Sequence, residues 1–344
     1  MQFSLFISCY YPDTGYPAER LYADMLEQAV LAEELGFSGL TVPEHHFINI
    51  LMNPGPLLLA LKIADATKRI PIRIAVLVLP FLDMKRLAGE IALTDCLTGG
   101  RLEIGVGRGA FAYEFKRFGV AVEDSRANFD ESLAVLEALL SREEVSWDGD
   151  YYKFDTLTTM PRPLQRPRPP IWIAALAPPA IYHSALKGYH IMTTPLSASA
   201  ETMREQVEAF NKAADELEAK GSAVPGFSLL RAGFVARDAA DARAKQRLAY
   251  GYFERFYNVR TLRGEVRGGA IEPIALDETV DEMAASLLVG TTDEVIAKLE
   301  TYAALGIPEI NLNMNIGASH RETMAAMERF AAEVMPHFAA DRAA

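Results

Sequence analysis

Segments with the composition of buried strands alternate along this chain with longer segments of helical periodicity, and this alternation constrains the fold more than any other feature. Strands separated by helices form right-handed βαβ units, which build a parallel sheet. About eight such units over 344 residues favour an α/β fold with a closed (β/α)8 barrel over an open doubly wound sheet. The predicted strands cover residues 2–8, 38–42, 72–79, 101–106, 171–175, 189–192, 227–235 and 309–312. The predicted helices cover residues 22–35, 56–67, 85–97, 128–141, 201–217, 239–257 and 320–334.

Two segments depart from the alternation. Residues 145–154 are predicted to form a small hairpin, with Asp148-Gly149 as the turn between two short strands that carry aromatic residues. Residues 260–279 are rich in glycine and have little periodicity, so we expect a long, mobile loop that closes over the site as a lid. No linker divides the chain, and one domain is therefore expected to cover residues 1–344.

Composition and charge argue against several classes of protein. Hydrophobic residues make up 50% of the chain, which argues against intrinsic disorder. The formal net charge of −12 argues against a sequence-independent partnership with nucleic acid, which needs a basic face. Cys9 and Cys96 lie in apolar runs and are predicted to be buried thiols in a reducing compartment, with no metal site. No signal peptide and no apolar run of membrane-spanning length is visible, so we expect a soluble, cytoplasmic protein.

The run Glu44-His45-His46-Phe47 follows the predicted strand at residues 38–42. In parallel α/β folds the active site is built at the carboxyl ends of the strands, and titratable side chains there are candidates for acid–base chemistry. One of the two histidines could equally be a structural donor with Glu44 as its partner. We assign the catalytic role to His45, and expect His46 to orient the loop or to contact Glu44.

A second candidate segment, residues 105–109, reads Gly-Val-Gly-Arg-Gly and follows the strand at residues 101–106. Glycines let the backbone approach a ligand closely, and the guanidinium of Arg108 suits a phosphate group. The spacing differs from the G-x-G-x-x-G dinucleotide fingerprint, and a tight turn with a solvated arginine is an alternative. Because both segments lie at carboxyl ends of parallel strands, His45 and Arg108 are expected on the same face of the barrel.

These motifs resemble, in order and spacing, those of the bacterial luciferase-like flavin monooxygenases, most closely the branch of the luciferase alpha subunits. The likeness spans nearly the whole chain. Its marks are the Glu44–Phe47 run, Asn53-Pro54, Leu79-Pro80, Gly100-Arg101, Gly107-Arg108-Gly109, Phe115 to Gly119, Ser125-Arg126-Ala127, Val289-Gly290-Thr291 and Val334-Met335-Pro336. The resemblance implies a TIM barrel that binds reduced FMN at the carboxyl ends of its strands.

The activity that the resemblance implies is oxygenation of a small organic substrate by reduced FMN and O2, through a C4a-hydroperoxyflavin. No second nucleotide-binding domain is visible, so a separate NAD(P)H:flavin reductase is expected to supply the reduced flavin. An F420- or FMN-dependent dehydrogenase on the same barrel is an alternative, and the deazaflavin F420 is not excluded as the cofactor. A non-catalytic flavin-binding partner subunit is a third possibility.

Carried over residue by residue, the resemblance implies that His45 is the catalytic acid or base and that Arg108 contacts the flavin phosphate. Ala75 and Val76 fall where the family has a non-proline cis peptide beneath the isoalloxazine ring. Glu44 is a further expected contact of the cofactor site.

The predicted phosphate site departs from the family pattern, which has an acidic residue, a serine and a threonine after the strand at residues 171–175. Leu176, Ala177 and Ala180 occupy those positions here, and the two prolines between them each lack a backbone N–H. A helix N-terminus can still offer backbone donors. We therefore expect Leu176 and Ala177 to contact the cofactor through the backbone, and Thr194 to contribute as well.

The expected substrate pocket is apolar. Phe47, Leu77 and Phe111 are candidates for its wall, although each could equally belong to the core. The predicted helices at residues 56–67 and 85–97 carry more apolar residues than one buried face needs, as the interface of a homodimer would.

Overall fold

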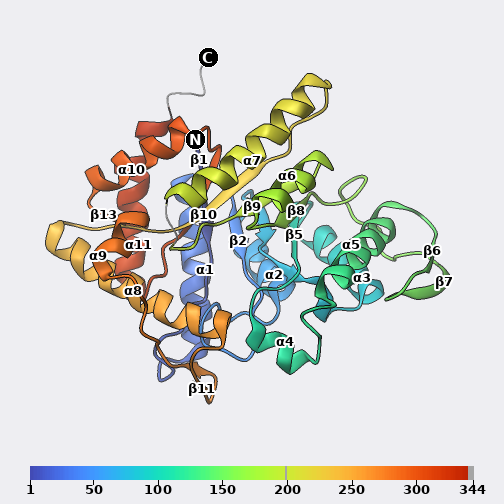
Figure 1. Ribbon diagram of the computed structural model, residues 1–344, viewed down its shortest axis with the longest axis horizontal. Coiled ribbons are helices and arrows are strands. Elements are labelled where there is room, and N and C mark those ends of the chain that lie inside the picture. Colours follow the sequence, from blue (N-terminus) through green and yellow to red (C-terminus); the bar gives the residue numbers. More distant parts are fainter. Residues whose placement is uncertain (198–199, 340–344) are drawn as a thin grey trace.

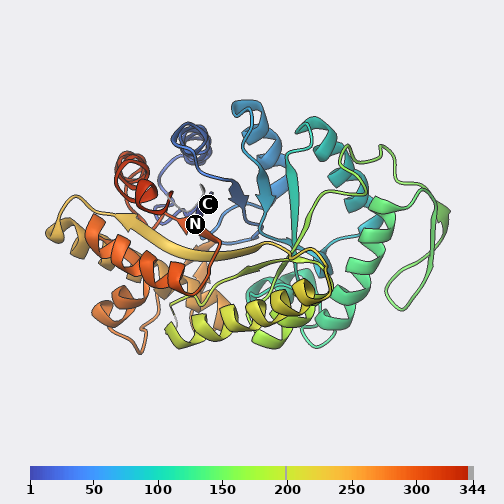
Figure 2. The ribbon, with the colours of Figure 1, turned by 90° about the horizontal axis from the view of Figure 1, so that it is seen from above.

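A ring of parallel strands forms the centre of the protein in this computed structural model, which describes residues 1–197 and 200–339. The first strand pairs in parallel with the second on one side and with the last on the other, so the ring is closed and the predicted barrel is confirmed (Figures 1 and 2). In ring order its members are β1 (Gln2–Phe6), β2 (Leu40–Val42), β3 (Ile72–Ile74) continued by β4 (Leu77–Val78), β5 (Leu102–Gly107), β8 (Ile171–Ala174), β9 (His190–Thr193), β10 (Phe227–Val235) and β14 (Glu309–Asn313). β13 (Leu288–Gly290) pairs with the last three residues of β10.

Helices surround the ring and cover its outer face (Figure 2). They are α1 (Ala18–Leu35), α2 (Pro56–Ala66), α3 (Met84–Leu97), α4 (Ala112–Phe118), α5 (Ser125–Ser141), α6 (Pro178–Leu186), α7 (Ala200–Ala219), α8 (Ala239–Thr261), α9 (Val280–Ser286), α10 (Thr292–Ala304) and α11 (His320–Arg329). Local sequence sets several of their ends. The Asp83 side chain accepts hydrogen bonds from the first amides of α3, and Ser319 and Glu322 form a capping box at the start of α11. Within the described residues, none of these helices is long and apolar enough to cross a membrane.

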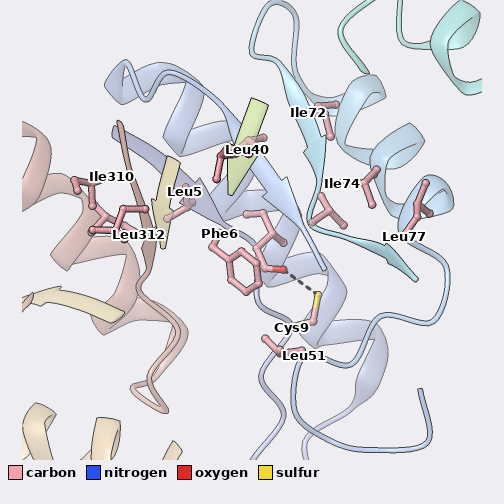
Figure 3. Close-up of a cluster of buried hydrophobic side chains, with 14 of the residues drawn as sticks. Leu5, Phe6, Cys9, Leu40, Leu51, Ile72, Ile74, Leu77, Ile310 and Leu312 are labelled. Carbon is pink, nitrogen blue, oxygen red and sulfur yellow. Dashed lines mark hydrogen bonds between the residues drawn. The ribbon is translucent and has the colours of Figure 1, made fainter. Parts of the chain in front are cut away.

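Side chains of the strands alternate between the helix layer and the interior of the barrel. Phe3 of β1 packs edge-on against Phe330, which follows α11, with ring centroids 5.0 Å apart. The next residue, Ser4, instead donates to Glu309 inside the barrel at 2.7 Å. The outward residues form the main hydrophobic core, in which Leu5, Leu40 and other strand residues are fully buried (Figure 3).

A buried layer of charges closes the interior at the amino ends of the strands. Arg73 donates to Glu309 at 2.9 Å and to Glu103 at 2.7 Å, and its guanidinium lies 3.4 Å from the ring centroid of Trp172. Ser228 and Ser4 also donate to Glu309. Burial opposes ionisation of Glu309, but the charge of Arg73 and these hydrogen bonds outweigh it and lower the pKa of Glu309.

Several details of the fold differ from the sequence-based prediction. The hairpin formed by β6 (Val145–Asp148) and β7 (Lys153–Leu157) is present, but Asp148 pairs with Lys153, so the turn is residues 149–152 and the predicted Asp148-Gly149 turn is wrong. Glu131 of α5 holds this turn by accepting three of its backbone amides. Cys96 is exposed on α3, which corrects the prediction of a buried thiol, whereas Cys9 is buried as expected.

The region at residues 260–279 is also more ordered in its structure than predicted. Helix α8 runs on to Thr261, and a short antiparallel hairpin follows, made of β11 (Val266–Arg267) and β12 (Ala270–Ile271). The side chain of Asn258 donates to the carbonyls of Glu265 and Glu272, which brackets the hairpin. The strands β11 and β12 have only two residues each, which is too few for the alternating pattern of a strand to be visible in the sequence.

Replacing Arg73 by alanine is expected to lower the free energy of unfolding by about 3–5 kcal/mol, because Glu309 would remain buried without its opposite charge. Urea denaturation followed by circular dichroism measures this loss. Arg86→Ala is the control, since the exposed Arg86–Glu90 pair should contribute no more than about 0.5 kcal/mol. Equal losses in the two variants would contradict a special role of the buried layer.

Candidate active site

A cavity of about 200 Å³ lies at the carboxyl ends of the strands, where a barrel of this kind carries its site. Strands, the loops that follow them and helix α8 all contribute to its wall. The residues that line it are Phe6, Pro43, His45, Leu51, Ala75, Val76, Ala174, Leu176, Met192, Thr193, Thr194, Leu196, Leu230, Ala232, Tyr252, Phe253, Phe256, Asn311 and Asn313. In Figure 1 this end of the barrel lies toward α4 and β11, and the two chain termini lie at the other end.

His45 is held in the cavity wall by a carboxylate and an aromatic ring. Its Nδ1 lies 3.1 and 3.2 Å from the two carboxylate oxygens of Glu114, which is only 1% exposed. The imidazole also stacks on Phe111, with ring centroids 4.2 Å apart and planes 18° from parallel. Because Glu114 engages Nδ1, the other ring nitrogen, Nε2, is the one left for proton exchange with a ligand.

Glu114 also supports the backbone of the histidine loop. It accepts the amide of His46 at 2.7 Å, so one carboxylate fixes both the ring of His45 and the peptide after it. Sequence analysis missed this residue, which lies on the short helix α4 and is 69 positions from His45. The only local signal was an acidic residue in the first turn of a helix, a position with an ordinary explanation in the helix dipole.

His46 and Glu44 form a second pair, directed away from the cavity. His46 Nε2 lies 2.9 Å from Glu44 Oε1, which confirms the expected contact. The other oxygen of Glu44 accepts the amide of Val78 at 2.9 Å. Glu44 thus ties the loop after β2 to β4, and the structure places it behind the cavity wall rather than in it.

Small residues between β3 and β4, and on β5 and β8, lie on one side of the cavity. The peptide bond between Ala75 and Val76 is cis, as predicted, and both residues line the cavity. Two glycines of β5 lie against this segment. A Cβ atom added to Gly105 would fall 1.9 Å from the carbonyl oxygen of Ile74, and one added to Gly107 would fall 2.7 Å from Val76 Cγ2. Any side chain at these positions would push the Ala75–Val76 segment into the cavity.

Only some of the predicted phosphate-binding residues line the cavity. Arg108 follows β5, is exposed, and forms no hydrogen bond or ion pair with any residue that the structure describes. Leu176 and Thr194 line the cavity, whereas Ala177 is exposed at the start of α6, where two prolines occupy the first helical turn. Arg108 directly follows Gly107, which lies against the cavity residue Val76, and an unpaired guanidinium suits a phosphate group such as that of a flavin nucleotide.

Of the three residues predicted to form the substrate wall, none lines the cavity directly. Phe47 is 52% exposed and points outward, against Phe118 at a ring distance of 5.3 Å, and Leu77 is buried in the hydrophobic core. The backbone of Phe47 has a φ of +64°, in the left-handed region. Phe111 forms a second layer, between His45 and Phe256.

The β11–β12 hairpin contacts the loop that carries His45. The amide of Ile271 donates to the side chain of Asn49 at 2.9 Å, and Gly269 lies next to the carbonyl of Phe47. The hairpin is therefore placed where a lid would act. Its movement during turnover stays a prediction, which hydrogen exchange at the Ile271 amide with and without FMN would test: equal protection in both states would contradict it.

A family model, a related sequence and solved structures all relate this chain to monooxygenases. The family model described as luciferase-like monooxygenase matches residues 1–309. The chain is 30% identical to the oxygenase component of a flavin-dependent trigonelline monooxygenase from Acinetobacter baylyi, over 98% of this chain and 96% of that protein. Monooxygenase RslO1 from Streptomyces bottropensis superposes with a TM-score of 0.85 and 27% identity, covering 98% of this chain and 100% of that one. The oxygenating constituent of 3,6-diketocamphane monooxygenase from Pseudomonas putida, solved with FMN, has the same fold (TM-score 0.76, 19% identity, 98% of both chains).

Replacing Glu114 by alanine is expected to change the tautomer of neutral His45. In the wild type the proton should reside on Nδ1, facing the carboxylate, and without Glu114 it should move mostly to Nε2. Nitrogen-15 NMR of the imidazole measures the two forms. Glu123→Ala removes an exposed carboxylate nearby in the sequence and should leave the tautomer unchanged. An Nε2–H tautomer in the wild type would refute the proposed role of Glu114.

Proposed function

Because the chain belongs to the luciferase-like monooxygenase family, we propose that it is the oxygenase component of a two-component system that uses reduced FMN and O2 to oxygenate a small organic substrate. A flavin-dependent monooxygenase needs a dry cavity, a fixed ring and one positioned acid or base. The observation that carries the proposal is the imidazole of His45, oriented by Glu114 in the wall of such a cavity.

Reduced FMN, when bound, supplies the electrons that activate O2. The residues that would hold it are Ala75, Val76 and Ala174 beside the ring, and Arg108 with the backbone at Leu176 beside the phosphate. Aliphatic and aromatic side chains make up most of the remaining wall and would exclude water from the reaction. His45 would give or accept a proton at Nε2 and so prevent the unproductive loss of hydrogen peroxide.

A separate NAD(P)H:flavin reductase would supply the reduced flavin. The Acinetobacter relative is itself described as an oxygenase component, which supports this division of labour. A deazaflavin such as F420 is the alternative cofactor. Anaerobic titration with FMNH2 and with reduced F420 separates the two: tighter binding of F420 would favour a hydride-transferring dehydrogenase instead.

A homodimer is the proposed assembly. Leu58 of α2 and Leu93 and Leu97 of α3 are 72%, 48% and 61% exposed, and these two helices are neighbours on the outside of the barrel. Exposed apolar side chains gathered in this way are typical of an interface between subunits. Light scattering of the eluting protein would test this, since a monomer at micromolar concentration would contradict it.

Replacing His45 by alanine tests the proposed chemistry. Removal of a general acid or base is expected to lower the rate of product formation by roughly 10²–10⁴-fold, with release of hydrogen peroxide in place of product. The assay must measure the oxygenated product rather than the consumption of NADH, which uncoupled turnover also causes. His46→Ala is the matched control, because its ring pairs with Glu44 outside the cavity. Undiminished product formation in His45→Ala would exclude it as the acid or base.

Replacing Arg108 by alanine tests the orientation of the cofactor. The variant should bind FMN more weakly, while its affinity for riboflavin should hardly change, because only FMN carries the phosphate. Calorimetric titration of both ligands into wild type and variant measures the difference. Arg126→Ala is a suitable control, since Arg126 is exposed and paired with Asp130 on α5. A similar loss of affinity for both ligands would mean that Arg108 acts on the ring or on the fold.

A further inference from the structure

The loops that follow β8 and β9 line one side of the cavity. The two strands pair in parallel register, with Ala174 opposite Met192. Leu176 and Thr194 are each two residues further along, so they lie at the same level, and both line the cavity. Beyond this level the two chains separate, the first into α6 and the second toward α7. Another contact must therefore hold the two loops together.

Arg108 leaves the sheet on the other side of β8. Val106 of β5 pairs in register with Ile173 of β8, so Arg108 and Ala175 are at the same level. The loop after β8 thus has the Arg108 loop on one side and the Thr194 loop on the other. The end of the cavity at which we place the flavin phosphate is therefore bounded by the loops after β5, β8 and β9.

Gln206 of α7 joins two of these loops from the helix layer. Its Nε2 donates to the carbonyl of Leu176 at 2.9 Å and to that of Thr194 at 3.2 Å. Because a carbonyl oxygen can only accept, these bonds fix which end of the side-chain amide faces the loops. Gln206 is 1% exposed, and its Oε1 is buried without a hydrogen-bond partner among the described residues. Since an unpaired buried acceptor is unfavourable, the benefit of glutamine at this position lies in the two bonds of Nε2.

The bond to Leu176 also sets the direction of a backbone N–H. The peptide between Leu176 and Ala177 is trans, and in a trans peptide the C=O and the N–H point in opposite directions. The Ala177 N–H therefore points away from the buried Gln206. Within the described part of the chain, no residue accepts a hydrogen bond from it.

This N–H is the only free donor of its kind at the start of α6. Pro178 and Pro179 are the first two residues of the helix and have no N–H. The amide of the next residue, Ala180, already donates to the carbonyl of Ala177 at 2.9 Å. An anion that binds beside this helix start thus depends on the direction of a single amide.

We propose that Gln206 is a positioning residue for the phosphate of the flavin: it holds the Leu176 carbonyl in the helix layer and so presents the Ala177 N–H to the phosphate beside Arg108. The inference rests on the proposed function, since the phosphate belongs to the flavin that we assign to this cavity. Gln206 itself touches neither cofactor nor substrate. A donor that is already oriented binds an anion without the cost of ordering its loop.

The test is a double-mutant cycle. Gln206→Met keeps the length of the side chain and removes its donor, whereas Ala177→Pro removes the amide. Ala177 has a φ of −80°, which proline can adopt. Oxidised FMN and riboflavin are titrated by calorimetry into the full-length wild type, the two single variants and the double variant. Asn211→Leu is the matched control, because Asn211 is another amide of α7 that donates to a backbone carbonyl, that of Leu305, and neither residue lines the cavity.

Ala177→Pro should weaken FMN binding by roughly 10- to 100-fold, the effect of one hydrogen bond to a charged group, and Gln206→Met by roughly 3- to 10-fold, because the amide can then turn away. Riboflavin lacks the phosphate and should bind to every variant as to the wild type. In the Ala177→Pro background, Gln206→Met should cause no further loss of FMN affinity, because the N–H that it orients is gone. Asn211→Leu should bind both flavins as the wild type does.

Three results would overturn the proposal. Gln206→Met could lose affinity for FMN and riboflavin equally, which would mean that Gln206 supports only the fold. Ala177→Pro could bind FMN as tightly as the wild type, or the losses caused by the two substitutions could simply add. Failure of the wild type itself to bind FMN would instead refute the proposed function, whereas normal binding by the wild type together with any of the three results refutes only the role of Gln206.

Discussion

Closure of the sheet is the constraint on which the rest of the structure depends. Since the parallel pairings run unbroken around the ring, from β1 through β9 and β10 to β14 and back to β1, no strand in the ring has a free edge and every carboxyl end lies on the same side of the molecule. Residues as distant in sequence as Phe6 and Asn313 therefore line one cavity. The site follows from the topology, because no local motif could have gathered these side chains.

The interior of the barrel is divided between two kinds of chemistry. At the amino ends, the guanidinium of Arg73 pairs with the carboxylates of Glu103 and Glu309. At the carboxyl ends, glycines and alanines leave the space open, and the wall around it carries almost no charge. The first arrangement stabilises the closed ring. The second leaves a cavity in which one histidine, fixed by Glu114, is the principal ionisable group.

Those parts of the fold and of the candidate site that have a local signal could be predicted from the sequence. The largely apolar runs predicted the strands, and β10 has the predicted bounds even though Ser228 and Arg231 interrupt its apolar sequence. The Glu44–Phe47 run revealed His45 because it directly follows a strand. Glu114 could not be found in this way, since its partner is distant in sequence and α4 is only seven residues long. The outward position of Phe47, at a positive φ, has no signal in the sequence. Cys96 was predicted wrongly because an apolar helix face does not reveal whether other residues cover it.

The hydrogen bond between Ile271 and Asn49 has a consequence for how such a barrel can diversify. Barrels usually acquire new activities by exchange of single loops on a constant scaffold. Here the hairpin at residues 266–271 rests on the loop that carries His45, and Asn258 fixes the base of the same hairpin. The two loops are thus joined by direct contact. Grafting one of them from a relative without the other would leave Asn49 or the Ile271 amide without its partner, so recombination should exchange them together.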